Sequence, residues 1–486
     1  MSHISLHPLW GSLALDREAE LPLQDQIVQF FRSAILSGRL HGGRRVPSSR
    51  QLATEHGISR TTAVEAYSRL SAEGYLVSRA GAGLFVPTSL PEDYLIRAAA
   101  RPAAAPAVWE GAQAAEADRV ELRHHFLPLA AGMPSLEHFP WKDWARLTAQ
   151  IHRERPLDAL GYGDPRGEPA LRQAIAEYLA VARGVVCKAE QIIIVGSSKQ
   201  ATDMVARVLA SPGDKVWFED PGHAVGRAVL EAAGLVPEPI PVDGKGLDVA
   251  EGVRRAPDAR LALITASHHY PLGYTLSLER RLALLDWAET AGARILEDDH
   301  DGEYRYARRP LPPLYTLDRT GRVIYVGSFS NILAPGLRLG YLVAPPDLVE
   351  AFLVMRASLA PILNQLVLAR FIASGRLASH LRRMRALYAQ RRSILIDALK
   401  ADAADVLNVL IAPDAGMRLV ATLRRDVDDE AVSLRCLERV INVHPLSPCY
   451  AEERRLSGFV LGFAATPEEQ IAPAVRTLAE IIRSMA

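Results

Sequence analysis

The stretch "VGSFSNILAPGLRLGYLV", residues 326–343, begins at the end of one short apolar run and finishes with another. Comparable runs recur from residue 126 to the end of the chain, separated by segments with helical periodicity. The clearest are QIIIV (191–195), KVWFE (215–219), LALIT (261–265), RILED (294–298), RVIYV (322–326) and LGYLV (339–343). This alternation predicts an α/β fold with a mainly parallel sheet covered by helices on both faces. Ligands of such sheets collect at the C-terminal ends of the strands.

The bulk composition is that of an ordinary globular protein. The 486 residues suggest two or three domains, and the 56 basic side chains balance the 56 acidic ones. Cys187, Cys436 and Cys449 are widely spaced and form no CxxC pair, which favours a reducing cytosol with neither a disulfide framework nor a zinc site. No signal peptide is visible, and no apolar run approaches the roughly 20 residues of a membrane helix. We therefore expect a cytoplasmic protein without membrane contact.

Residues 21–87 have the layout of a winged helix. A first helix carries apolar residues on one face and closes at Gly38. A second helix has Ser48 as its N-cap and Gly57 at its end, and a third begins after Ser59. Helix, helix-turn-helix and hairpin in this order define the motif, and we assign residues 15–88 to it.

The third helix and the hairpin complete this motif. Val64, Tyr67 and Leu70 are expected to face the core of the small domain. The segment "YLVSRAGAGLFVP" (75–87) reads as two short strands joined by a glycine-containing turn, which forms the wing.

Arginines gather around the second and third helices, which suggests DNA binding. The first residues of the second helix of a helix-turn-helix enter the major groove, where arginine can bond a guanine edge at two points. The expected DNA contacts are Arg45, Ser49, Arg50, Ser59, Arg60, Thr61, Thr62 and Gly83. The alternative is an arginine-rich solvated face on a small accessory domain.

The same segment closely resembles the winged-helix domain of GntR-family bacterial regulators. The matching stretches are AILSGRL (34–40), PSSRQLA (47–53), SRTTAVEAYSRL (59–70) and EGYL (73–76). This resemblance implies binding to double-stranded operator DNA, with Arg50, Ser59, Arg60 and Thr61 as the foremost contacts and Gly83 in the wing.

Residues 89–125 form the predicted linker between two domains. They are rich in Ala and Pro and poor in large apolar residues, so this segment cannot bury enough surface to pack by itself. The second domain is assigned to residues 126–486.

Several strand ends in the second domain carry residues suited to a planar, phosphorylated ligand. Ser198 and Lys199 open a helix, whose free N–H groups can bind an anion. His223 follows a Pro-Gly turn, where its ring can stack on a flat ligand, although a lone histidine there is more often structural. Asp298 ends a strand, where carboxylates hold either a metal ion or a protonated ring nitrogen. Arg338 offers a fork that matches a phosphate dianion.

In this order the stretches resemble fold-type I aminotransferases, and most closely the aminotransferase-like half of MocR-type regulators. The resemblance covers most of residues 126–345 and matches the C-terminal hundred residues more loosely. It is carried by LGYGDPRGEPALRQAIAEYLAVARGV (160–185), SPGDKVWFEDPGH (211–223), SHHYPLGYTLSLERRLALLDWA (267–288), ILEDDHDGEYRY (295–306) and RVIYVGSFSNILAPGLRLGYLV (322–343).

The resemblance implies a site for pyridoxal phosphate. It gives Asp298 to the pyridine nitrogen, and it puts His300 where a tyrosine usually touches the ring hydroxyl. It also puts His223 in the stacking position usually held by tyrosine. The remaining residues that it implies are Tyr270 beside the ring and Ser198, Ser328, Ser330 and Arg338 around the phosphate.

One position departs from the family pattern "GSFSKTL", in which the lysine forms the covalent imine with the cofactor. This chain reads "GSFSNIL", with Asn331 at that place. An amide nitrogen does not add to an aldehyde as a lysine amine does, so turnover should be abolished or very slow. None of the six lysines is near position 331 in sequence, and only Lys199 is expected in the cavity, where it should point at the phosphate. Val460 stands approximately where the family carries the arginine that clamps the substrate carboxylate.

We therefore expect a bacterial transcription regulator whose large domain senses pyridoxal phosphate, its amine form or an amino-acid adduct without a covalent bond. A head-to-tail homodimer is expected, because fold-type I sites usually lie between subunits. The alternatives are a pyridoxal phosphate-dependent aminotransferase with an appended DNA-binding domain, and a regulator whose large domain ignores this cofactor. Natural drift and an engineered lysine removal both explain Asn331.

Overall fold

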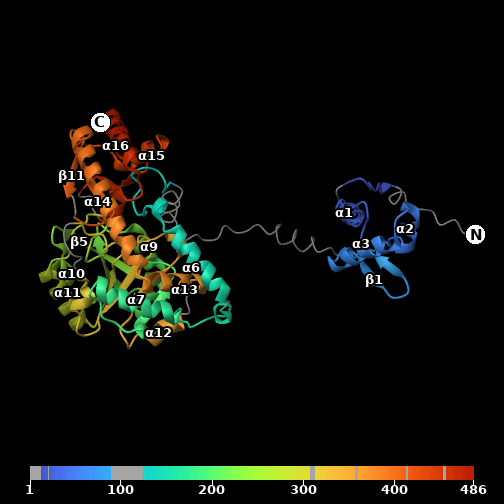
Figure 1. The fold of residues 1–486 in the computed structure, drawn as a ribbon, viewed down its shortest axis with the longest axis horizontal. Helices are drawn as coiled ribbons and strands as arrows, with labels where there is room; N and C mark the ends of the chain where they lie inside the picture. Colours follow the sequence, from blue (N-terminus) through green and yellow to red (C-terminus); the bar gives the residue numbers. More distant parts are fainter. Residues whose placement is uncertain are drawn as a thin grey trace, which may run out of the picture. The chain divides into compact units, whose positions relative to one another are not determined.

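The computed structural model describes residues 12–19, 21–88, 124–154, 156–306, 312–355, 360–411, 414–452 and 456–485. The chain divides into two compact units, Met1–Val108 and Trp109–Ala486 (Figure 1). The linker predicted at 89–125 falls outside the described residues except for its last two positions. Among the helices of the described ranges, none is long and apolar enough to cross a membrane.

The first unit consists of helices and a hairpin. Its elements are α1 (Leu23–Leu36), α2 (Ser49–His56), α3 (Arg60–Ala72), β1 (Val77–Arg79) and β2 (Gly83–Phe85). Ser48 Oγ accepts the Gln51 N–H at 3.2 Å and Ser59 Oγ accepts the Thr62 N–H at 3.0 Å, so both serines cap their helices. Gly57 ends α2 with a φ of 62°, which favours glycine.

The core of this unit lies between α1 and α3. Phe31 and Tyr67 meet edge to face, with 5.4 Å between their ring centroids. The prediction that Val64 faces the core is wrong, because its side chain is 45% exposed. A rotation of about 100° per residue carries it away from the buried stripe. That stripe consists of Ala63, Ala66, Tyr67 and Leu70.

The second unit is built on an eight-stranded sheet in the order β3-β10-β9-β8-β7-β4-β5-β6. Its strands are β3 (Ile192–Val195), β4 (Lys215–Asp220), β5 (Val236–Asp243), β6 (Gly246–Leu247), β7 (Leu261–Ile264), β8 (Arg294–Asp298), β9 (Val323–Ser328) and β10 (Gly340–Val343). The five strands from β9 to β5 are parallel to one another, while β10 is antiparallel to β3 and β9. All six apolar runs of the sequence form strands, and the mainly parallel sheet is confirmed.

Helices cover both faces of this sheet. They are α6 (Trp141–Glu154), α7 (Pro169–Ala182), α8 (Ser198–Leu209), α9 (Ala224–Ala232), α10 (Val249–Arg255), α11 (Leu278–Ala291), α12 (Val349–Val354) and α13 (Ile362–Ala373). Alternate residues of β3 show the two layers. Ile192 and Ile194 pack in a cluster with residues of α7 and α13, whereas Ile193 and Val195 pack in another with residues of α8.

The C-terminal part contains a second, antiparallel sheet in the order β11-β12-β14-β13. Its elements are α14 (Arg376–Asp402), β11 (Leu407–Ile411), β12 (Arg418–Leu423), α15 (Asp429–Glu438), β13 (His444–Pro445), β14 (Gly458–Gly462) and α16 (Glu468–Met485). The short 3-10 helices of the unit are η2 (Leu136–His138), η3 (Leu157–Leu160), η4 (Ala189–Gln191), η5 (Leu314–Leu317), η6 (Pro335–Leu337) and η7 (Ser447–Cys449).

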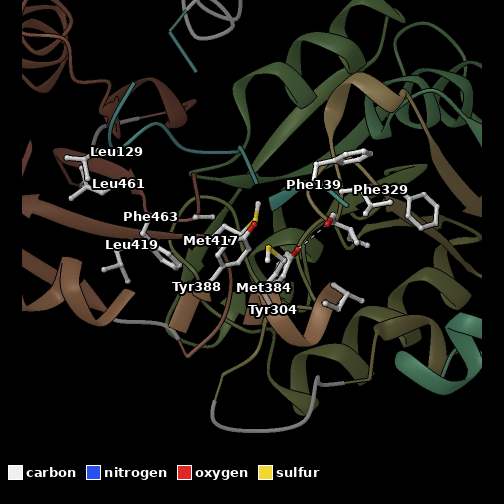
Figure 2. Packing of buried hydrophobic residues seen from close by; sticks show 14 of the residues in the cluster. Leu129, Phe139, Tyr304, Phe329, Met384, Tyr388, Met417, Leu419, Leu461 and Phe463 are labelled. Atoms are coloured by element: carbon white, nitrogen blue, oxygen red, sulfur yellow. Dashed lines mark hydrogen bonds between the residues drawn. The ribbon is translucent and has the colours of Figure 1, made fainter. Parts of the chain in front are cut away.

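A buried aromatic pair, Tyr304 and Tyr388, joins the segment after β8 to α14 (Figure 2). Tyr304 and Tyr388 lie 5.0 Å apart between ring centroids, and both are fully buried. The Tyr304 hydroxyl donates to the main-chain oxygen of Asn331 at 3.1 Å. The Tyr388 hydroxyl accepts the N–H of Ser135 at 2.9 Å. This part of the core therefore fixes the backbone at position 331.

Candidate functional site

Three neighbouring strands bring the predicted phosphate-binding residues to one edge of the large sheet. Gly340, the first residue of β10, pairs with Val195 at the end of β3 and with Ser328 at the end of β9. Because β3 and β9 are both antiparallel to β10, their C-terminal ends lie at the same edge. The turn that follows β3, the segment that follows β9 and Arg338 before β10 therefore meet there.

The turn between β3 and α8 presents backbone N–H groups. Ser197 Oγ accepts the Gln200 N–H at 3.2 Å, and Gln200 Oε1 accepts the Gly196 N–H at 2.6 Å. The N–H of Ser198 bonds to none of the described residues and remains available at the helix start. Lys199 lies in the same first turn with an exposed side chain. This helix start is suited to an anion.

Arg338 and the two serines after β9 complete this edge. Arg338 has a φ of 52°, a conformation that costs a non-glycine residue about 1–3 kcal/mol and that clusters at ligand sites. Its side chain is exposed. Ser328 is 7% exposed, and its Oγ accepts the N–H of Ser330 at 3.1 Å.

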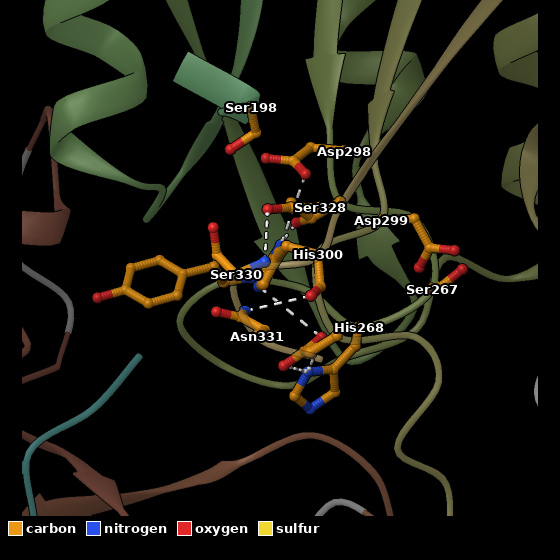
Figure 3. Close-up of polar contacts among 12 residues, drawn as sticks. Ser198, Ser267, His268, Asp298, Asp299, His300, Ser328, Ser330 and Asn331 are labelled. Atoms are coloured by element: carbon orange, nitrogen blue, oxygen red, sulfur yellow. Dashed lines mark hydrogen bonds and ion pairs between the residues drawn. The ribbon is translucent and has the colours of Figure 1, made fainter. Parts of the chain in front are cut away.

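Asp298 is the last residue of β8 and lies beside the same edge, opposite Val326 of β9. Figure 3 shows it grouped with His300, Ser328 and Ser330. Its buried Oδ1 has no hydrogen-bond partner among the described residues, and His300 Nδ1 lies 3.9 Å away from it. Burial raises the pKa of Asp298, and His300 partly offsets that increase. A ligand that donates a charged N–H would satisfy this oxygen.

Two rings stand at the ends of β4 and β7. His223 precedes α9 and is exposed, whereas Tyr270 is half-buried. Their ring centroids lie 4.8 Å apart with an angle of 43° between the planes. Because β4 and β7 are adjacent and parallel, both rings reach the edge that carries Asp298.

A buried acid lies at the end of β4. Glu219 Oε2 accepts the N–H of Thr265 at 3.0 Å and its hydroxyl at 2.6 Å. Burial raises the pKa of Glu219 to about 8, since these two hydrogen bonds offset only part of the desolvation. The side chain is therefore mainly protonated at neutral pH.

Asn331 occupies the segment after β9, held by polar contacts from two directions. Its Nδ2 donates to the main-chain oxygen of His300 at 3.1 Å (Figure 3), and its own main-chain oxygen accepts from Tyr304. The side chain is thus bonded to the backbone that follows β8. It carries an amide and no basic amine.

A buried charge cluster behind His300 was missed in the sequence. Arg418 Nη1 donates to Asp301 Oδ2 at 2.9 Å, and Arg418 Nη2 lies 3.3 Å from His300 Nε2. His268 Nδ1 lies 3.1 Å from both oxygens of Asp301. Burial by itself raises the pKa of Asp301, but His268, His300 and Arg418 lower it well below its usual range. An arginine that opens the otherwise apolar segment "RLVA" was the available signal.

Two of the acids after β8 each pair with an arginine of their own. Asp299 pairs with Arg183, and the hydroxyl of Tyr325 donates to it at 2.7 Å. Asp301 pairs with Arg418, as described above. These contacts favour a ring nitrogen over a metal ion as the partner of Asp298.

The predicted DNA contacts of the first unit fall into three groups. Arg50, Arg60 and Thr61 are exposed, and they lie in the first turns of α2 and α3. Ser59 and Thr62 are partly engaged in the helix cap, with 2.8 Å between their hydroxyl oxygens. The remaining residues are Ser49, half-buried at the start of α2, exposed Arg45, which pairs with Phe85 of the hairpin, and exposed Gly83 at the start of β2.

Two family descriptions match this chain. Residues 23–86 match "Bacterial regulatory proteins, gntR family", and residues 124–478 match "Aminotransferase class I and II". The kynurenine aminotransferase of Pyrococcus horikoshii has a similar structure, with a TM-score of 0.70 and 26% identity. That comparison covers 76% of this chain and 94% of the other.

Relatives with both parts are similar over nearly the whole length. The probable rhizopine catabolism regulatory protein MocR of Rhizobium meliloti is 37% identical over 470 residues, 96% of this chain and 95% of its own. The pyridoxine biosynthesis transcriptional regulator PdxR of Corynebacterium glutamicum is 31% identical over 464 residues, 94% of this chain and 96% of its own.

A GntR-type winged helix joined to a fold-type I aminotransferase domain defines a class of DNA-binding transcription regulators. Within that class, the chain belongs to the MocR-type regulators of the GntR family. The aminotransferase-type domain implies pyridoxal phosphate binding in this family.

Proposed function

We propose that the large domain senses pyridoxal phosphate, its amine form or an amino-acid adduct without a covalent bond, and that the ligand changes the affinity of the winged helix for operator DNA. The observation that carries this proposal is the pairing of two features. Asp298 Oδ1 is buried and lacks a donor among the described residues, while the position of the imine-forming lysine holds Asn331.

The residues at the sheet edge fit a phosphorylated pyridine. The unpartnered oxygen of Asp298 matches a protonated ring nitrogen, and the start of α8, with Ser198 and Lys199, matches the phosphate. In this proposal Ser328, Ser330 and Arg338 contact the phosphate from the adjoining strand ends, while His223, Tyr270 and His300 border the ring. Pyridoxal phosphate, when bound, supplies an aldehyde and an electron-withdrawing ring.

Asn331 makes sensing the better proposal than catalysis. An amide neither attacks an aldehyde nor moves a proton as a lysine amine does. Its Nδ2 is also committed to the His300 carbonyl oxygen. The chain therefore binds and orients the ligand and leaves its aldehyde free for amines in solution.

The DNA contacts are proposed to differ in strength. Arg50, Arg60 and Thr61 present exposed side chains to DNA, and Arg45 and Gly83 contact the backbone at the wing. Ser49, Ser59 and Thr62 contribute less, because Ser59 and Thr62 bond each other and Ser49 is half-buried.

A head-to-tail homodimer is also proposed. Leu157, Leu160 and Tyr162 of the large unit are 80%, 77% and 99% exposed, and three large apolar side chains so close in sequence need cover. A second copy would bury them and supply the two arrangements that a ligand can bias. Light scattering after size exclusion checks this: Leu157→Asp with Leu160→Asp should convert dimer to monomer, and a monomeric wild type would refute it.

The proposed function is tested with the purified chain and a duplex that it selects from a random library. Calorimetry should show binding of pyridoxal phosphate, and borohydride treatment should leave the protein mass unchanged. The ligand should shift the Kd for the duplex by about 5- to 150-fold, the range of ordinary coupling energies. A borohydride-fixed mass would support an aminotransferase, and absence of binding by pyridoxal phosphate, its amine form and their adducts would support a regulator that ignores this cofactor.

A further inference from the structure

Arg418 is placed to contact a ligand held at Asp298. It opens β12 opposite Gly462 of β14, and its side chain is 3% exposed. Its guanidinium carbon lies 4.7 Å from the centroid of the Tyr270 ring, and its Nη2 lies 3.3 Å from His300 Nε2. Two residues proposed to border the ring therefore touch this one arginine.

The hydrogen-bonding capacity of Arg418 is not used up. A guanidinium has five N–H groups. Nη1 donates to Asp301, Nη2 approaches His300, and Nε is buried without a partner among the described residues. One buried unpaired N–H costs about 1–3 kcal/mol. The Nε and Nη2 edge of the fork matches the two oxygens of a carboxylate.

Asp301 satisfies only part of the Arg418 guanidinium, because the carboxylate of Asp301 also bonds to His268. Both oxygens of Asp301 lie 3.1 Å from His268 Nδ1, and only Oδ2 accepts from Arg418. The edge of Arg418 that faces away from Asp301 is therefore the one left for a second anion.

The adjoining part of the small sheet is apolar. Val460 of β14 pairs with Val420 of β12, two residues along the ladder from Arg418. Both valines belong to an apolar cluster with Leu272, Leu446 and Tyr450. That cluster offers a carboxylate no cation, whereas Arg418 at the start of β12 does.

We infer that Arg418 binds a carboxylate of the effector. The preferred ligand is then pyridoxal phosphate joined to an amine that carries a carboxylate. This inference rests on the proposed function and narrows it. With the ring at Asp298, a substituent that extends past His300 and Tyr270 reaches the Nε and Nη2 edge. The cofactor without an amino acid leaves that edge unpaired.

A purely structural Arg418 would behave differently. It would hold Asp301 and His300 in place and would support all ring ligands alike. The two roles are therefore distinguished by the ratio between the affinities of one variant for a ligand with a carboxylate and for one without it. A general loss of folding changes both affinities together and leaves this ratio unchanged.

The test compares two reduced adducts that differ by one carboxylate, phosphopyridoxyl-L-alanine and phosphopyridoxyl-ethylamine, by calorimetry on the full chain. Wild type should bind the alanine adduct at least about tenfold more tightly. The double variant Arg418→Met with Asp301→Asn removes both charges together, so no unpaired buried charge remains, and its ratio should fall to near one. Arg418→Lys, which keeps the charge and loses the fork, should give an intermediate ratio.

Arg294→Met serves as the matched control, because Arg294 lies at the opposite end of β8 and pairs with Asp347. Its ratio should equal that of wild type. A wild-type ratio near one with tight binding of pyridoxamine phosphate would overturn this inference and leave the proposed function intact. A ratio that stays tenfold in the double variant would overturn the role of Arg418, whereas no binding of any ring ligand would overturn the proposed function itself.

Discussion

The side-chain amide of Asn331 donates a hydrogen bond of 3.1 Å to the main-chain oxygen of His300. This contact ties the segment after β9 to the segment after β8, the two places from which ring and phosphate contacts are expected. The Asn331 side chain, at the lysine position, thus helps to hold the two segments together but offers no amine to a ligand.

Replacing Asn331 by lysine should restore covalent attachment. The new amine would start from a backbone that Tyr304 already fixes, so Asn331→Lys should yield a borohydride-stable mass increase on the peptide that contains residue 331. Peptide mass spectrometry after treatment with pyridoxal phosphate measures this. Asn331→Gln is the matched control and should stay unlabelled. Labelling of wild type at Lys199 would contradict the noncovalent proposal.

Asp298→Asn should weaken ligand binding. The amide keeps the size of the side chain but loses the charge that matches a protonated ring nitrogen, a hydrogen bond of about 1.5–3 kcal/mol. We expect roughly a 10- to 100-fold higher Kd for pyridoxamine phosphate by calorimetry. Asp318→Asn, at the other end of the neighbouring strand β9, should not alter it. An unchanged Kd in Asp298→Asn would remove the main support for the ring position.

Arg60→Ala should weaken DNA binding by about 1–3 kcal/mol and relax base preference at one position. The reason is that Arg60 opens α3 with an exposed side chain. Fluorescence anisotropy with a selected duplex and its single-base variants measures both effects. Arg69→Ala is the control on the same helix, because Arg69 pairs with Asp25 and Glu73. Equal losses in the two variants would refute the placement of Arg60 in the groove.

Glu219→Gln should flatten the pH dependence of stability. Since the pKa of Glu219 is raised from 4.5 to about 8, the folded state keeps a proton that the unfolded state releases. The free energy of unfolding therefore falls as the pH rises between about 4.5 and 8, by on the order of a few kcal/mol. A glutamine still accepts from Thr265 and carries no charge.

Urea denaturation at about pH 5, 6.5 and 8, which spans most of the range between the two pKa values, measures how the free energy of unfolding changes with pH. The glutamine variant should gain most over wild type at the highest pH. Glu279→Gln is the control, because Glu279 is 83% exposed and should leave the slope as it is. Parallel slopes in wild type and Glu219→Gln would show that Glu219 is ionised throughout.

The sequence was sufficient where one local pattern determines the structure. Six apolar runs became six strands, and Ser48, Gly57 and Ser59 capped or ended the helices as expected. The meeting of Ser198, Ser328 and Arg338, which the resemblance implied, follows from strand direction, because β3 and β9 end at the edge where the antiparallel strand β10 begins.

Other features depend on contacts between distant segments. Val64 is exposed because the buried stripe of α3 is set by which face meets α1. The pairing of Arg418 with Asp301 spans 117 positions and needs the small sheet to be placed against the large one. No periodicity or motif in a single sequence reveals that two residues so far apart along the chain are in contact, so the Arg418–Asp301 pair became visible only in the structure.

The apolar packing around Val460 limits the substitutions that this part of the domain can accept. A lysine introduced at position 331 would supply a nucleophile, but an arginine introduced at 460 would bury a cation among packed hydrocarbon side chains at a cost of several kcal/mol. The fold would therefore accept an arginine at 460 only together with replacement of several of its apolar neighbours.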